Sequence, residues 1–485
     1  MKQSMSKKKY LALAVALGLG MGAALPSVEA ADQTRAQQDL QAQQQYIQQQ
    51  AGSTNAEVKL GKMTFDVGNV SVTGNNKMSE KSILRLVPEL RNKTVNVRTL
   101  SKQIQLVNDN GAMHLTAYLH PGGSGKYDVE IKTEELKSQH VNVGISNTGN
   151  DYTGDWRLTA SYIDSNISHS NDSLGIAFVT SPAGGHWSDV RQAALQYRLP
   201  LPKHSDSFVF NASYSDVDLG SVYNYPGLFD LSSSGKSNTV GMHFQHNYAY
   251  SAHEKDIIDI GVDHKKYENK NNWHFASSTD FPVNYDFSVN TAGLTFIHND
   301  RNASHSFTYS LGYVKSFAGD QQDLEAATPG SDSSFDYWTA GINYVLSSPS
   351  DWRMALRVHG QYSSDDLVST EQIGAGGIYS VRGYDERVLG GDTGVVGSFE
   401  VYSPEFAKHQ RALFFVDAGN LRNNNDRNTL FTHDELASSG IGYRYTADNL
   451  YFALDYVFAM SDPDCFDRIS HPEHKRWNVV MNASF

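Results

Sequence analysis

Residues 374–385 of this chain read Gly-Ala-Gly-Gly-Ile-Tyr-Ser-Val-Arg-Gly-Tyr-Asp. The stretch lies between two runs in which apolar and polar residues alternate as in β-strands, Trp352–Ser363 and Gly394–Pro404. Small residues at this density let a backbone fold into a confined space. An arginine carried into such a space needs an acidic partner, because an unpaired buried charge is costly. The pattern predicts a loop that folds inward and holds Arg382 against a carboxylate.

A carboxylate of this kind follows in residues 413–419, which read Leu-Phe-Phe-Val-Asp-Ala-Gly. On a strand, Phe415 and Asp417 share one face, while Phe414 and Val416 share the other. Because an aspartate that faces lipid is costly, we expect Asp417 to point into the lumen of a barrel.

Glu400 interrupts the strand Val395–Tyr402 in the same way and is a second candidate lumenal carboxylate. We therefore predict an inward-folded loop at residues 364–393, pinned by Arg382 on Asp417. Few apolar residues are available to anchor this loop: Ile378, Tyr379, Val381 and Tyr384. Its position should accordingly depend mainly on the one polar contact. The alternative is an ordinary surface loop, with Asp417 at a strand end.

Two motifs taken together resemble those of a known family. Residues 380–384 read Ser-Val-Arg-Gly-Tyr, and residues 415–419 read Phe-Val-Asp-Ala-Gly. In this order they resemble the paired signature of the two-partner secretion transporters, which are the haemolysin secretion/activation proteins of Gram-negative outer membranes. That family belongs to the superfamily that includes barrel-assembly insertases. The resemblance implies a lumenal loop motif of Ser380, Val381, Arg382, Gly383 and Tyr384, with barrel-wall partners at Phe415, Asp417, Gly419 and Glu400.

The composition fits a membrane barrel. The 485 residues are 39% hydrophobic and 11% aromatic, with 39 glycines and a formal net charge of −13. Many aromatic residues without long apolar runs are typical of strands with one polar face. After residue 30, no stretch approaches the about 20 apolar residues of a spanning helix. The negative charge argues against nucleic acid as a partner.

Residues 1–30 have the pattern of a signal peptide. Lys7-Lys8-Lys9 precede the apolar core Leu11–Leu25, and Val28-Glu29-Ala30 places small residues where a signal peptidase needs them. The chain has a single cysteine, Cys465, so an internal disulfide framework is excluded.

A glutamine-rich segment, residues 31–60, is predicted to form an N-terminal helix and linker. Residues 33–50 contain good helix formers without glycine or proline, which fits either a disordered linker or a polar helix. The resemblance favours a helix, since such transporters often begin with one that can plug the barrel lumen. Residues 51–55 then have the composition of a flexible joint.

Residues 61–137 are predicted to form one small α/β domain. A strand at Phe65–Thr73 precedes a helix that Ser79 caps and Pro88 ends, and a second helix spans Val97–Val107. Two further strands follow: Ala112–Leu119 and Tyr127–Thr133. This order resembles a single POTRA domain, the periplasmic substrate-docking module of the superfamily, whereas two-partner secretion transporters usually have two.

Residues 138–485 contain about sixteen alternating segments, which predicts a transmembrane barrel of about sixteen strands. Tight connections are expected at 200–205, 251–256 and 446–449, and long ones at 218–235, 320–333 and 419–434. The last strand alternates strictly at Trp477, Val479, Met481 and Phe485, as an outer-membrane assembly signal does. The alternative is a strand that merely ends the chain. The predicted fold class is thus mainly β, with the barrel preceded by one POTRA-like domain.

No enzymatic or cofactor site is indicated. The glycines at 374–377 lack the Lys-Ser/Thr ending of a phosphate loop. Cys465, His471 and His474 form a weak set of zinc ligands, so no metal is expected there. The 18 histidines form no grouping with serine and a carboxylate that suggests catalysis. We therefore expect neither an enzyme nor a cofactor.

The function that these observations and the resemblance favour is translocation, without nucleotide, of a large secreted exoprotein of haemolysin or adhesin type. The expected partners are this β-helical exoprotein, docked on the POTRA-like domain, together with outer-membrane lipid and the barrel-assembly machinery during biogenesis. Docking is expected by β-augmentation on an edge strand, either Ala112–Leu119 or Phe65–Thr73. The expected location is the cell outer membrane, with the POTRA-like domain in the periplasm. An insertase-like assembly factor and a passive porin or adhesin are the alternatives.

Overall fold

The computed structural model describes residues 63–150, 152–182, 187, 189–225, 229–251, 253–275, 280–327, 330–424, 433–447, 449–461 and 475–485. The predicted signal peptide, the glutamine-rich segment and the three weak zinc ligands Cys465, His471 and His474 lie outside the described residues. Among the helices that are described, none is long and apolar enough to span a bilayer.

A small α/β region precedes the barrel, as predicted. Its elements are β1 (Thr64–Thr73), α3 (Glu80–Leu86), η1 (Pro88–Arg91), β2 (Thr94–Asn96), α4 (Val97–Asn108), β3 (Met113–Pro121), η2 (Gly123–Gly125) and β4 (Tyr127–Glu135). The sheet has the order β2-β1-β4-β3, with β1 parallel to β4 and the other pairs antiparallel. The helices and the sheet share a buried apolar core that includes Ile83, Val87, Leu100 and Ile131.

Local sequence signals explain these elements. The Ser79 hydroxyl accepts a hydrogen bond from the backbone N–H of Ser82 at 3.1 Å, which caps α3. Strand β2 was not predicted, because three residues are too few to show alternation. Strand β2 pairs with β1 only at Thr64–Asp66, so it covers the start of the predicted edge Phe65–Thr73, while the remainder of β1 is paired with β4 alone. Strand β3 is an edge of this sheet.

A closed antiparallel barrel of sixteen strands follows, as predicted. The strands in chain order are β5 (Gln139–Ser146), β6 (Arg157–Asp164), β7 (Ser173–Thr180), β8 (Val190–Leu201), β9 (Asp206–Tyr225), β10 (Phe229–Tyr250), β11 (Glu254–Phe275), β12 (Asp280–Arg301), β13 (His305–Gly319), β14 (Asp336–Ser347), β15 (Arg353–Tyr362), β18 (Thr393–Tyr402), β19 (Gln410–Arg422), β20 (His433–Thr446), β21 (Leu450–Ala459) and β22 (Lys475–Ser484). Pairing of β22 with β5 closes the ring.

Side chains alternate between the two faces of the barrel wall. On β9, for example, Phe210 and Tyr214 are exposed on the outside, whereas Ser213 and Ser215 are buried on the inside. An apolar outer surface and a polar interior are what a lipid-embedded barrel requires.

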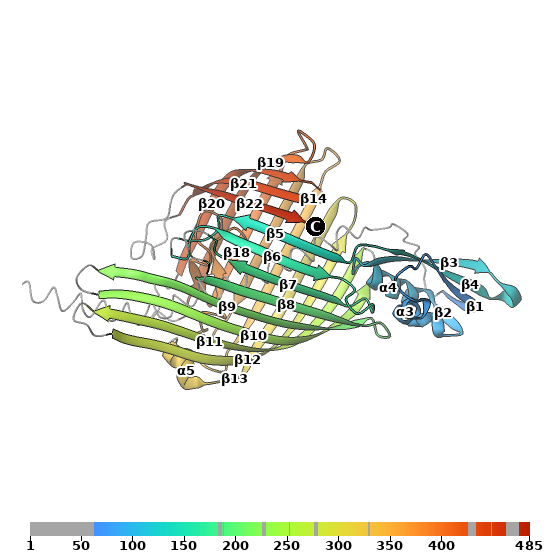
Figure 1. Cartoon of the computed structure of the whole chain (residues 1–485), viewed down its shortest axis with the longest axis horizontal. Coiled ribbons are helices and arrows are strands. Elements are labelled where there is room, and N and C mark those ends of the chain that lie inside the picture. The colour runs from blue at the N-terminus through green and yellow to red at the C-terminus, as the bar shows by residue number, and fades with distance from the viewer. Residues whose placement is uncertain are drawn as a thin grey trace, which may run out of the picture.

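The strands β9 to β12 are unusually long. They contain 20 to 22 residues each, whereas about 9–11 residues suffice to cross a bilayer. Their hairpins project from the end of the barrel opposite the α/β region (Figure 1). The prediction of a long loop at 218–235 was therefore wrong, because the ladder between β10 and β11 continues to Phe229 and Phe275 and organises the polar residues there as strands. The predicted long connection at 320–333 contains the short helix α5 (Gln321–Ala327).

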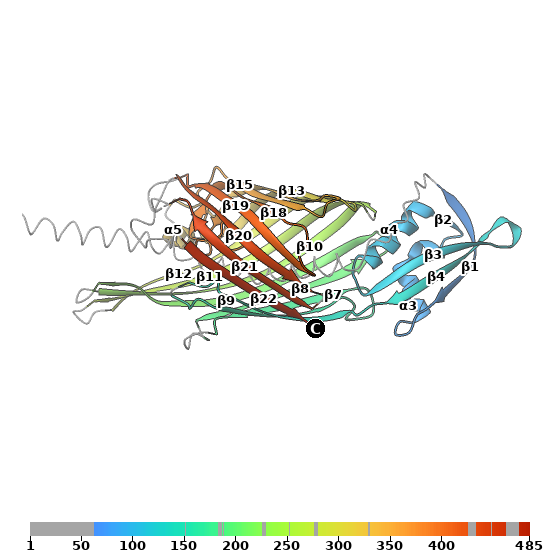
Figure 2. The same cartoon turned by 90° about the horizontal axis from the view of Figure 1, so that it is seen from above.

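The α/β region lies at one end of the barrel, with α4 next to the strand ends (Figure 2). Asp109, which follows α4, accepts from two barrel side chains: its carboxylate lies 2.6 Å from Lys255 Nζ and 3.4 Å from Arg301 Nη2. The neighbouring Asn110 donates to the backbone carbonyl of Asn171 at 3.0 Å. An acidic residue at a helix C-terminus opposes the helix dipole, and the two barrel cations offset that repulsion.

Candidate functional site

The connection between β15 and β18 folds into the barrel. Within it, β16 (Ile373–Ala375) and β17 (Leu389–Gly391) form a two-stranded sheet, and the segment between them carries the Ser-Val-Arg-Gly-Tyr motif at its tip. Gly383 has a φ of +92°, and a Cβ there would lie 2.9 Å from Val457 Cγ1 on the wall. Gly419 on β19 leaves room for the loop on the side of the wall, since a Cβ at this position would lie 3.1 Å from the Cβ of Ala375. These two glycines explain how closely the loop can approach the wall.

At the tip of the loop, Arg382 forms a bidentate pair with Asp417 on β19. Arg382 Nε donates to Asp417 Oδ2 at 2.7 Å, and Nη2 donates to Asp417 Oδ1 at 2.8 Å. The backbone N–H of Arg382 donates to the same carboxylate at 3.1 Å. The arginine side chain is 4% exposed and the aspartate side chain 0% exposed. Charge-assisted contacts of this geometry are among the strongest polar contacts in proteins.

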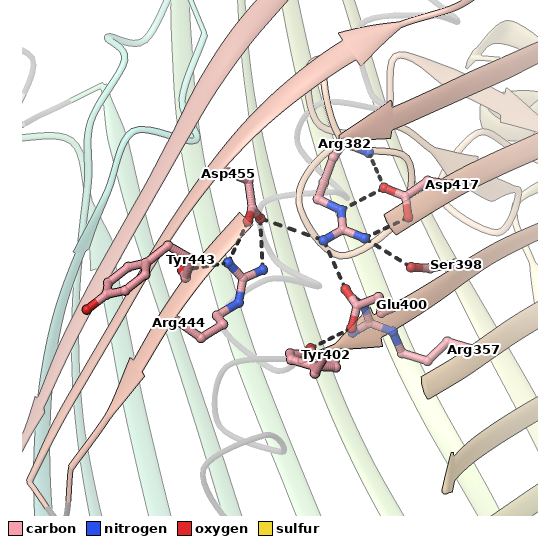
Figure 3. Close-up of polar contacts among 9 residues, drawn as sticks. All are labelled: Arg357, Arg382, Ser398, Glu400, Tyr402, Asp417, Tyr443, Arg444 and Asp455. Atoms are coloured by element: carbon pink, nitrogen blue, oxygen red, sulfur yellow. Dashed lines mark hydrogen bonds and ion pairs between the residues drawn. The ribbon is translucent and has the colours of Figure 1, made fainter. Parts of the chain in front are cut away.

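The same guanidinium contacts four further wall residues, of which Figure 3 shows Glu400, Asp455 and Ser398. Nη1 lies 2.9 Å from Glu400 Oε1 and 3.6 Å from Asp455 Oδ2, and Nη2 donates to Ser398 Oγ at 3.2 Å. The ring of Phe415 lies under the guanidinium, with 3.5 Å from Cζ to the ring centroid. A cation over a desolvated aromatic face gains further stabilisation.

Two more arginines complete the charge balance. Arg444 Nη2 donates to Asp455 Oδ2 at 2.9 Å, and Arg357 Nη2 donates to Glu400 Oε1 at 3.2 Å. We call the resulting set the arginine cluster: Arg357, Arg382, Arg444, Glu400, Asp417 and Asp455. Its three cations and three anions compensate one another, which is the condition for keeping charges in a low-dielectric space.

The loop is also anchored by further contacts, which include two of the residues that the sequence offered as anchors, Val381 and Tyr384. The hydroxyl oxygen of Tyr384 lies 2.9 Å from the backbone carbonyl oxygen of Ala437 and 2.8 Å from that of Ser461, so its single hydrogen is donated to, or shared between, these two acceptors. Val381 is fully buried, whereas Tyr379 is 43% exposed. Leu389 at the base of the loop is also fully buried.

A second polar anchor holds the base of the loop against different strands of the wall. Glu371 accepts from Lys265 Nζ on β11 at 2.6 Å and from the Tyr337 hydroxyl on β14 at 2.9 Å. Beside it, Leu367 and Val368 are fully buried in an apolar cluster with residues of α5 and β14. The expectation that one polar contact positions this loop was therefore wrong, because the base and the tip are held separately.

The structure brings together most of the residues that the sequence suggested. Arg382, Asp417, Glu400 and Phe415 meet in one cluster, and Ser380 Oγ accepts from the backbone N–H of Gly376 at 3.2 Å. Their role in transport stays a prediction. Asp455 was missed, although it interrupts the apolar strand Tyr451–Phe458 just as Asp417 interrupts its own.

The closing strand lies apart from the arginine cluster. On the outer face of β22, Trp477 and Met481 are 55% and 44% exposed, with Val479 between them, and Phe485 directly after the strand is 64% exposed. This arrangement fits a lipid-facing strand. Its role as an assembly signal stays a prediction.

Comparisons with known proteins agree with this architecture. The family model "Haemolysin secretion/activation protein ShlB/FhaC/HecB" matches residues 125–445. The chain is similar to the heme/hemopexin transporter protein HuxB of Haemophilus influenzae, with 22% identity over 365 residues, which are 72% of this chain and 61% of HuxB. The chain thus spans less than two thirds of the length of this curated relative.

Two solved structures share the fold. CdiB from Acinetobacter baumannii has a TM-score of 0.68 and 20% identity, covering 87% of this chain and 74% of that one. CdiB from Escherichia coli has a TM-score of 0.68 and 16% identity, covering 95% of this chain and 98% of that one. Taken with the family match, the barrel and its inward loop show that this chain is an outer-membrane β-barrel protein of the haemolysin secretion/activation family.

Proposed function

We propose that this chain translocates a secreted partner protein across the outer membrane through the barrel lumen. The observation that carries the proposal is the loop between β15 and β18, which enters the lumen and is held there by the arginine cluster. A permanently open pore has no use for a buried, charge-balanced loop. A conduit that opens for one client can use such a loop, because its ion pairs can break when the client enters and form again afterwards.

The periplasmic α/β region is proposed to act as the docking domain. Strand β3 is an edge of its sheet, with one side paired to β4 along Met113–Pro121. An extended client can add a strand to such an edge through backbone hydrogen bonds, which tolerate many sequences. Pro121 and the exposed His120 terminate the edge at its far end and limit indiscriminate pairing.

No nucleotide is required in this scheme. The client enters as an extended chain, and its folding outside the cell supplies the direction. The names of the similar proteins fit a client that is itself exported: HuxB is named for heme and hemopexin transport, and CdiB as an outer-membrane transporter. A protein with β-helical repeats, encoded next to this chain, is the client that we expect.

The test is co-expression of this chain with that neighbouring exoprotein in a Gram-negative host. The exoprotein should reach the medium when the chain is present and accumulate in the periplasm when it is absent. The levels of unrelated outer-membrane barrels should stay constant in both strains. Release without this chain would refute the proposal, and a general loss of outer-membrane barrels in its absence would favour an assembly factor instead.

A further inference from the structure

A patch of acidic and imidazole side chains lies on the outer face of β11–β13, at their periplasmic ends. We call it the outer acidic patch; its members are Glu254, Asp256, His298, Asp300 and His305. Their outward direction follows from alternation, because Ile260 on β11 and Leu294 on β12 are exposed to lipid on the same face. Arginine and lysine are not among the members, so the five groups carry only negative charge when the imidazoles are neutral.

The register of the strands places like charges opposite each other. Glu254 pairs directly with Asp300, and Asp256 pairs directly with His298. Two carboxylates directly opposite each other on one face of a sheet repel and destabilise it. Lys255 and Arg301, which are adjacent in sequence to members of the patch, have side chains on the opposite face of the wall, and both contact Asp109 of the α/β region. Neutralisation of the patch must therefore come from its own imidazoles or from solution.

The positions of the ligand atoms fit a metal ion. Glu254, Asp256 and His298 each offer one ligand atom, and the three atoms lie within 4.8 Å of one another. His298 Nδ1 lies 2.6 Å from Asp256 Oδ1, and His305 Nε2 lies 3.1 Å from Asp300 Oδ2. Because the strands are fixed by a continuous ladder, the side chains need only rotate to close on an ion.

We propose that Glu254, Asp256 and His298 bind a divalent transition-metal ion of the Zn²⁺ type, with Asp300 available as a further oxygen ligand. An imidazole nitrogen beside carboxylate oxygens suits Zn²⁺ and its first-row neighbours, whereas Ca²⁺ and Mg²⁺ prefer oxygen alone. The bound ion removes the repulsion between Glu254 and Asp300. It also ties the ends of β11 and β12 together at the edge of the membrane.

The experiment uses the untagged, metal-free full-length protein in detergent micelles, titrated with Zn²⁺ in a calorimeter. The double variant Glu254→Gln with Asp256→Asn should weaken binding at least about tenfold, since loss of even an outer-shell partner weakens metal sites by that much. The matched control is His246→Gln with Asp206→Asn. This pair is another imidazole–carboxylate contact at the same end of the barrel, with 2.9 Å between Nδ1 and Oδ1, and it should leave Zn²⁺ affinity unchanged.

A second measurement needs no variant. X-ray absorption of the wild-type protein with one equivalent of Zn²⁺ should show one imidazole and otherwise oxygen ligands, at about 2.0–2.2 Å. A sulfur ligand would locate the ion at Cys465 and overturn the proposal. So would Zn²⁺ affinity that is equal in the wild type and the Glu254/Asp256 variant, or affinity that the control variant lowers as strongly.

Discussion

Removing the arginine at the centre of the cluster should release the tip of the loop. In Arg382→Met, the three carboxylates Asp417, Glu400 and Asp455 face only Arg357 and Arg444, so the wall keeps one uncompensated negative charge. Breaking a buried ion pair in this way costs about 3–5 kcal/mol, and we take about 3 kcal/mol because the lumen admits water. That free energy raises the ratio of released to inserted loop tip by roughly 150-fold.

The partner variant, Asp417→Asn, leaves the opposite imbalance, with three cations facing two anions. The double variant Arg382→Met with Asp417→Asn restores neutrality among the remaining four charges. Its effect should therefore be smaller than the sum of the two single effects by about 2 kcal/mol, as expected for directly contacting residues. Glu371 still holds the base of the loop in all three proteins, and the barrel strands are unchanged, so barrel insertion, measured by heat-modifiable migration, should stay normal.

The position of the tip can be measured by double electron–electron resonance in a Cys465→Ser background. One spin label replaces Tyr379, which is 43% exposed near the tip, and the other replaces Ile441, which is 61% exposed on β20. The control is Arg411→Met, which removes a different arginine–aspartate pair with Asp351 at the barrel rim and should leave the distance distribution unchanged. If the single effects sum to the double effect within about 0.5 kcal/mol, Arg382 and Asp417 do not act as a pair.

Three further predictions follow from other contacts. In Glu371→Gln, the ammonium of Lys265 loses its anion, so the base of the loop should detach and single-channel conductance in planar bilayers should rise; unchanged conductance would contradict the role of this anchor. In Asp109→Asn, the contact with Lys255 weakens, so α4 should exchange its amide hydrogens faster, and exchange as slow as in the wild type would contradict the docking. For Glu135, burial acts to raise the pKa, but backbone N–H donors at residues 76–78 outweigh it and hold the pKa below its ordinary value. Its contribution to stability is therefore present above the unfolded pKa and lost as pH falls through the folded one, so Glu135→Gln should destabilise the α/β region by about 1 kcal/mol near pH 7 and not at low pH, as thermal unfolding by circular dichroism can check.

Much of the architecture could be predicted because a barrel encodes its wall residue by residue. Alternation identified the strands, and a lone carboxylate in an apolar strand identified Asp417 and Glu400 as lumenal. Asp455 carries the same signal and could have been found by applying it to every strand. The contact between Arg382 and Asp417 rested on two motifs that are 35 residues apart in sequence and hydrogen-bonded in the structure.

Other features depend on tertiary context and leave little trace in the sequence. The extension of β9 to β12 depends on neighbouring strands that continue each other's ladder, so Asp218–Gly235 resembled a loop when considered alone. The anchor at Glu371 joins residues more than a hundred positions apart, and no local pattern pairs it with Lys265. Strand β2 is too short to alternate.

Under the proposed function, the neutrality of the arginine cluster determines which charge the lumen presents to the translocated chain. Five of its six charges belong to the wall, and only Arg382 belongs to the loop. When the loop withdraws, the charged groups that remain on the wall have one net negative charge, at the place that Arg382 occupied. A lysine or arginine of the moving polypeptide can occupy the vacated place and leave it again. In the proposed translocation, opening of the lumen would then amount to an exchange of one cation for another, in which the returning Arg382 competes with the client for the same three carboxylates.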